Sequence, residues 1–79
     1  MGNHYQISEV GLDEDGIFVQ KLSVNGQVVI EGNYKKCQKY AYKNMQGSDT
    51  YQEDGLRLLT RVEFVNDYID DIAFANNEI

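Results

Sequence analysis

The chain has 79 residues, of which 42% are hydrophobic and 25% are charged, so one folded domain spanning residues 1–79 is expected rather than wholesale disorder. A chain of this length has a small interior and a stability of roughly 4–12 kcal/mol, which argues against a deep catalytic cleft. We therefore expect a non-enzymatic surface function with no cofactor. The 13 acidic and 7 basic residues give a net charge of −6, which disfavours direct nucleic-acid or membrane binding and favours a protein partner with a basic surface.

The first predicted strand covers His4–Leu12, where Tyr5 and Ile7 alternate with polar residues. The residues 13–16 that follow, Asp-Glu-Asp-Gly, predict a turn because adjacent carboxylates stay solvated and glycine tolerates unusual dihedral angles. With these four residues as the loop, the predicted pairs are Ile7 with Leu22 and Leu12 with Ile17.

The dipeptide Asn25-Gly26 separates two β-branched runs within residues 16–32. Both residues tolerate the positive φ angles of a type I′ turn, so the dipeptide predicts a tight hairpin with a fixed register. The pairs expected across it are Val24 with Gln27, Leu22 with Val29, and Gln20 with Glu31.

This register places apolar residues on both faces of the three-stranded meander. One face is expected to carry Tyr5, Ile7, Phe18, Leu22, Val24 and Val29. The other face is expected to carry Val10, Leu12, Val19, Val28 and Ile30. A water-exposed sheet face is usually polar, so the pattern indicates either a bulge that shifts the register or a second protomer over Val10, Val19, Val28 and Ile30.

A helix is predicted over residues Asn33–Gln46, with Asn33 as its N-cap and Gly47 just beyond its end. Its apolar stripe consists of Tyr34, Cys37, Ala41 and Met45, spaced as on one helix face. The opposite surface carries Lys35, Lys36, Lys39 and Lys43.

The remaining third of the chain predicts a polar loop over Gly47–Gly55 and a strand over Leu56–Val65, in which apolar residues alternate. Asn66–Asp71 is expected to turn the chain, and Ile72–Ala75 to form a short last strand. The order β-β-β-α-β-β therefore predicts an α+β fold with an antiparallel sheet and one helix packed on one face.

No group of residues predicts a catalytic or metal centre. Asp13-x-Asp15-Gly16 matches only the beginning of a calcium loop, and His4 has no further ligands at a suitable spacing. Cys37 lies on the apolar stripe, so we expect a buried thiol. A single cysteine forms no internal disulfide, and no membrane span or secretion signal is evident, which predicts a cytoplasmic protein.

Acidic residues gather in the predicted loops and turns, where a basic partner can reach them. The predicted partner-binding residues are Asp13, Glu14, Asp15, Asp49, Glu53, Asp54, Asp67, Asp70 and Asp71. Tyr51 and Tyr68 accompany these acids, and tyrosine is enriched in protein-recognition surfaces. The sequence thus favours a non-enzymatic inhibitor or adaptor that binds another protein through acidic loops.

The small size, the acidity, the single α+β sheet and the lack of a catalytic set resemble the phage-encoded anti-CRISPR proteins. The order of the Asn25-Gly26 hairpin, the helix Asn33–Gln46 and the strand Leu56–Val65 is similar in outline to several inhibitors of type I surveillance complexes. The resemblance implies that the acidic residues replace phosphates in the nucleic-acid groove of a CRISPR–Cas subunit. The lysine-rich helix departs from a pure DNA mimic, which would be acidic over more of its surface.

Two alternatives stay open at this point. The chain can be a structural or regulatory homo-oligomer, in its simplest form a homodimer, joined through the second apolar sheet face. It can also be a weak nucleic-acid binder that uses the lysines of the predicted helix, although the net charge opposes phosphate binding.

Overall fold

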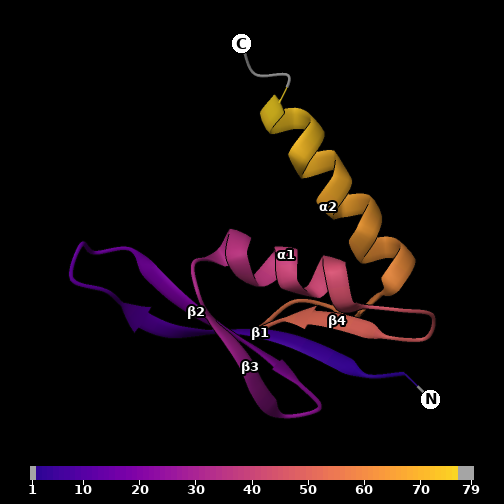
Figure 1. The fold of residues 1–79 in the computed structure, drawn as a ribbon, viewed down its shortest axis with the longest axis horizontal. Helices are drawn as coiled ribbons and strands as arrows, with labels where there is room; N and C mark the ends of the chain where they lie inside the picture. Colours follow the sequence, from indigo (N-terminus) through magenta and orange to yellow (C-terminus); the bar gives the residue numbers. More distant parts are fainter. Residues whose placement is uncertain (1, 77–79) are drawn as a thin grey trace.

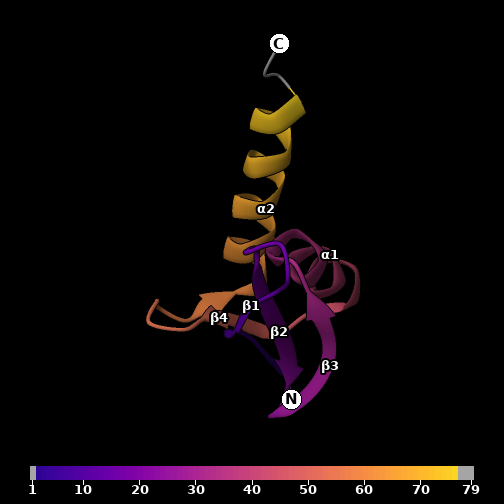
Figure 2. The same ribbon diagram turned by 90° about the vertical axis from the view of Figure 1, so that its left-hand side faces the viewer.

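The computed structural model describes the backbone of residues 2–76 and the side chains of residues 2–72, and these form an α+β fold with a mixed five-stranded sheet and two helices (Figures 1 and 2). The strands are β1 (His4–Leu12), β2 (Phe18–Val24), β3 (Gln27–Gly32), β4 (Thr50–Glu53) and β5 (Leu59–Thr60), and the helices are α1 (Tyr34–Asn44) and α2 (Arg61–Asn76). The sheet order is β3-β2-β1-β4-β5. The predicted fold class is confirmed, whereas the fully antiparallel sheet and the single helix were wrong.

Strand β1 has the predicted bounds and pairs antiparallel with β2. Ile7 lies opposite Leu22 as expected, but Leu12 lies opposite Phe18 rather than Ile17. The register shifts between Glu9 and Gly11, where Val10 is the extra residue of a β-bulge.

The β2–β3 hairpin turns at Asn25-Gly26, whose φ angles of 53° and 87° suit a type I′ turn. The pair of Val24 with Gln27 is confirmed. A second bulge then shifts the register by one residue, so the other two predicted pairs were wrong. The observed pairs are Leu22 with Ile30, Lys21 with Glu31, and Gln20 with Gly32.

The β2–β3 bulge also corrects the predicted faces of the sheet. Ile30 lies opposite the buried Leu22 and packs against the hydrophobic core, not on the second face. Val29, expected on the core face, and Phe18 are 39% and 55% exposed. The bulge that the apolar pattern indicated is therefore present, and it turns Ile30 toward the core while Val28 and Val29 stay exposed.

Strand β4 lies inside the segment that was predicted to be a polar loop, and it pairs parallel with β1, Tyr5 lying opposite Tyr51. Parallel neighbours need a long crossover, and here the hairpin β2–β3 and helix α1 supply it. No local pattern predicts this pairing, because β4 has only four residues and its partner lies more than forty residues earlier.

Helix α1 begins as predicted, because the Asn33 side chain accepts a hydrogen bond from the Lys36 N–H at 2.7 Å. It ends earlier than predicted, at a C-cap formed by Met45, so Gly47 is not the terminating glycine. Cys37 and Ala41 are fully buried on the sheet side, and α1 packs on one face of the sheet (Figure 1).

Of the predicted strand over 56–65, only Leu59–Thr60 form a strand, β5, and helix α2 takes the place of its last five residues, of the turn over 66–71 and of the strand over 72–75. A capping box starts it: the Glu63 carboxylate accepts a bond from the Thr60 N–H at 3.0 Å, and Thr60 Oγ1 accepts one from the Glu63 N–H at 3.3 Å. Figures 1 and 2 show that α2 leaves the body of the domain and projects outward, with Ile69 and Ile72 exposed.

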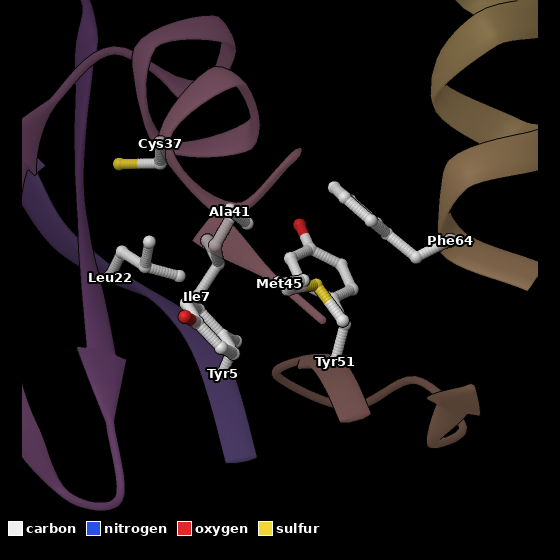
Figure 3. Close-up of a cluster of buried hydrophobic side chains, with 8 residues drawn as sticks. All are labelled: Tyr5, Ile7, Leu22, Cys37, Ala41, Met45, Tyr51 and Phe64. Atoms are coloured by element: carbon white, nitrogen blue, oxygen red, sulfur yellow. The ribbon is translucent and has the colours of Figure 1, made fainter. Parts of the chain in front are cut away.

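The hydrophobic core lies between α1, the sheet and the first turns of α2 (Figure 3). Its buried members are Tyr5, Ile7, Leu22, Cys37, Ala41, Met45, Tyr51 and Phe64. Tyr51 from β4 and Phe64 from α2 face each other with ring centroids 4.1 Å apart. This contact fixes the base of α2 against the sheet, and it thereby positions the groove described next.

Candidate functional site

A groove of about 580 Å³ lies where α1, α2 and the segment from β4 to β5 meet. Its aromatic lining consists of Tyr34, Tyr51, Phe64 and Tyr68. Its acidic lining consists of Glu53, Asp67, Asp70 and Asp71. Four of the nine predicted partner-binding acids therefore meet in one place, from a strand and a helix that are distant in sequence.

The aromatic side chains form a row from the core to the rim of the groove. Phe64 lies 4.1 Å from Tyr51 and 6.0 Å from Tyr68, and Tyr68 lies 4.6 Å from Tyr42 of α1, all between ring centroids. Tyr51 and Phe64 are buried, so they form the floor, whereas Tyr34 and Tyr68 are partly exposed. Tyr34 and Tyr68 are thus the rings that a ligand can contact.

Glu53 is held in a fixed position at one side of the floor. Its Oε2 accepts hydrogen bonds from the phenols of Tyr34 and Tyr51, the second at 3.0 Å. Burial, together with the Glu53 carboxylate, raises the pKa of both phenols well above the usual value for tyrosine. Both phenols therefore remain donors at neutral pH, and within the described residues no hydrogen bond reaches Oε1 of Glu53.

The groove also contains one basic residue, Arg57, which is already paired. Its guanidinium lies 2.8 Å from Glu63 at the start of α2, and this bond, followed by the Thr60 N–H, lowers the pKa of Glu63 to about 2. Among the residues that the structure describes, this is the one ion pair. Arg57 also interacts electrostatically with Asp67, but no described basic side chain forms an ion pair with Asp67 or Asp70, so the lining keeps an excess of negative charge.

Two lysines of α1 border the groove near Asp71, although neither forms an ion pair with it among the described residues. Lys35 and Lys39 line an adjoining cavity of about 170 Å³ together with Tyr68, Asp71 and Ile72. All four lysines of the helix are exposed, as the sequence predicted.

The remaining predicted acids lie elsewhere, and some have structural roles. Asp13 stabilises its turn by accepting hydrogen bonds from the N–H groups of residues 15 and 17 at 2.9 and 3.0 Å, whereas Glu14 and Asp15 are exposed. Asp54 accepts a bond from the Gln6 side chain at 2.8 Å. The turn at 13–16 is thus a second, separate acidic surface.

Asp49 was expected in an exposed loop but is only 7% exposed. Its carboxylate accepts hydrogen bonds from the backbone N–H of Asn3 at 2.7 Å and of Gln46 at 2.9 Å. It joins the start of the chain to the connection between α1 and β4. This arrangement gives Asp49 a structural role, and its burial leaves little of it for a partner to contact.

The four residues of the predicted oligomer interface do not share one surface. Val10 and Val28 are 54% and 44% exposed, Val19 is half-buried, and Ile30 packs against the core. Val10 occupies the bulge of β1, next to Leu12 and Phe18 at the outer end of the β1–β2 hairpin.

Neither His4 nor Cys37 contributes to the groove. The His4 Nδ1 atom forms a hydrogen bond with the Thr50 hydroxyl, 3.0 Å away. Cys37 is fully buried, and this burial raises the pKa of its thiol. Within the described part of the chain no three His, Cys, Asp or Glu residues are placed to hold a metal ion. What the groove offers is recognition of a cation by carboxylates and aromatic rings.

Sequence reasoning missed six lining residues of the groove: Tyr34 and Gln38 on the predicted helix, and Leu56, Arg57, Leu59 and Phe64 in the predicted strand. The signal that would have relocated the last four is the capping box Thr60-x-x-Glu63, which marks Thr60 as the N-cap of a helix that begins at Arg61. None of the described helices is long and apolar enough to cross a bilayer. A comparison with protein-family models, curated proteins and solved structures finds no match to this chain.

Proposed function

We propose that this protein is a non-enzymatic inhibitor or adaptor that binds the basic surface of another protein through the acidic groove between β4 and α2. The observation that carries the proposal is the convergence of Glu53, Asp67, Asp70 and Asp71 on an aromatic surface, with the one arginine of that surface paired to Glu63. Carboxylates without an internal counter-ion attract Lys and Arg residues of a partner.

The exposed acids of the 13–16 turn provide a second contact in this proposal. Glu14 and Asp15 are solvated and lie in a tight turn, away from the groove residues in the fold. A partner with an extended basic surface, such as a nucleic-acid-binding channel, would meet both acidic regions. In keeping with the anti-CRISPR resemblance, we propose the DNA-binding groove of a CRISPR surveillance complex as the first such channel to assay.

The test compares two variants that remove the same charge from different surfaces. The groove variant is Asp67→Asn with Asp70→Asn, and the control variant is Glu14→Gln with Asp15→Asn. Each protein is immobilised and exposed to host lysate at about 0.1 M and about 1 M salt, because the Debye length falls from about 10 Å to about 3 Å over that range.

We expect the wild type to retain basic, nucleic-acid-binding proteins at low salt and to release them at high salt. The groove variant should retain much less of the same proteins, and the control variant should lose less than the groove variant. Retention that is equal for wild type and groove variant, or unaffected by salt, would contradict the proposal. A purified surveillance complex then gives a direct assay, in which the wild type should reduce DNA binding and the groove variant should not.

A further inference from the structure

The groove has features that distinguish among cationic ligands. Its volume of about 580 Å³ falls within the range of about 300–1,000 Å³ that is usual for ligand pockets. It combines carboxylates, partly exposed tyrosine rings and the aliphatic side chains of Leu56 and Leu59. A ligand that fits must therefore carry a cation, a surface that stacks on aromatic rings, and an apolar stem.

We infer that the groove binds the side chain of an arginine presented by the partner protein, an inference that rests on the proposed function. The guanidinium is planar, stacks on aromatic faces, is weakly hydrated, and pairs with carboxylates through two parallel N–H groups. A lysine ammonium is a compact and strongly hydrated charge, so it gains less from the rings of Tyr34 and Tyr68.

Glu53 provides the fixed acceptor in this arrangement. Both phenols that hold it, from Tyr34 and Tyr51, bond to Oε2, so Oε1 keeps its capacity to accept N–H groups. A carboxylate oriented in advance loses little conformational freedom when a ligand binds. Asp67 and Asp70, which are exposed on α2, supply the second acidic side of the groove.

Arg57 shows that this part of the molecule accommodates a guanidinium. It lines the same groove and bonds through its terminal nitrogen to Glu63 at 2.8 Å, but its pairing leaves the other acids open to an external arginine. The guanidinium of the partner would meet Glu53 and the α2 acids, and its methylene groups would contact Leu56 and Leu59.

The experiment titrates the ¹⁵N-labelled full chain with three short peptides that differ at one residue. The peptides carry arginine, lysine or citrulline, the last being uncharged and of nearly the same shape as arginine. We expect arginine to shift the amide resonances of Tyr34, Glu53 and Tyr68, with an affinity at least about fivefold above that of lysine, and citrulline to bind much more weakly.

Two groove variants and one control complete the test. Glu53→Gln and Asp70→Asn should each weaken arginine binding about tenfold, and Glu31→Gln, at an exposed acid of β3 outside both acidic regions, should leave it unchanged. Asp70 is exposed, so its substitution keeps the inference testable if Glu53→Gln does not fold. Equal affinity for the lysine peptide, or shifts that map to the 13–16 turn, would overturn the inference. If the lysate assay shows salt-sensitive partner binding but the titration shows no preference for arginine, only this inference is rejected. If the arginine peptide binds but the lysate yields no basic partner protein, the proposed function is rejected.

Discussion

The reassignment of Asp49 from an exposed acid to a structural one makes a quantitative prediction. Asp49→Ala removes both acceptors for the N–H groups of Asn3 and Gln46, which lie in a partly buried environment. Hydrogen bonds to charged groups contribute about 1.5 kcal/mol each at the low end, so Asp49→Ala should lower the free energy of unfolding by about 2–3 kcal/mol. For a domain of this size, that corresponds to a fall in Tm of roughly 10–20 °C.

The assay is urea unfolding followed by far-UV circular dichroism, with Glu14→Gln as the control for lost negative charge. Glu14 is exposed, and its substitution should change the free energy of unfolding by less than about 0.5 kcal/mol. Asp49→Asn keeps one carbonyl acceptor, so its free energy of unfolding should lie between those of Asp49→Ala and Glu14→Gln. If Asp49→Ala and Glu14→Gln unfold at the same urea concentration, the reasoning about the two backbone hydrogen bonds is wrong.

The remaining predictions concern the start of α2 and the buried thiol. Because Arg57 and Thr60 lower the pKa of Glu63 to about 2 from its ordinary value of 4.5, the stabilisation from this carboxylate is complete above about pH 4.5 and is lost as the pH falls through about 2. The difference in Tm between wild type and Glu63→Gln should therefore narrow as the pH falls from about 4.5 to about 2. A difference that stays constant over this range would show that the Glu63 carboxylate does not link stability to pH. Burial of Cys37 and the raised pKa of its thiol should make its reaction with a disulfide reagent slow in the native protein and rapid in denaturant. Immediate labelling of the native protein would show that the thiol is accessible.

The first half of the fold could be predicted from the sequence because local chemistry decides it. Strand β1, the Asn25-Gly26 turn and the Asn33 cap each depend on residues within a few positions, and the structure has all three. The β2–β3 bulge could not be placed, because Val29 is apolar like its neighbours Val28 and Ile30. The β1 bulge at Val10 did have a local sign, since Gly11 follows it and a glycine inside a strand often marks a bulge.

The second half was misread for two different reasons. Leu56, Leu58, Val62 and Phe64 alternate like a strand, but the capping box of Thr60 and Glu63 competes with that pattern and decides it in favour of a helix. Strand β4 depends on a non-local parallel partner that no local pattern reveals.

The acidic residues of the candidate site could be found from sequence, but their grouping could not. Glu53 lies on β4, while Asp67 and Asp70 lie on α2, so these acids come together through tertiary packing, in which Phe64 contacts Tyr51 and Tyr68 contacts Tyr42. A list of acids also cannot separate solvated carboxylates from one that satisfies buried N–H groups. Asp49 is the example: the segment around it, residues 47–55, is mostly polar like an exposed loop, yet its carboxylate is buried and accepts a backbone hydrogen bond.

The central position of β1 has a consequence for how the protein is made. During translation β1 emerges from the ribosome before the strands that flank it, and β2 can pair with one side of it at once. Its other side stays without a neighbour until Glu53 at the end of β4 has been synthesised. We therefore expect the nascent chain to pass through a stage with an open strand edge, which is where aggregation or chaperone binding would occur.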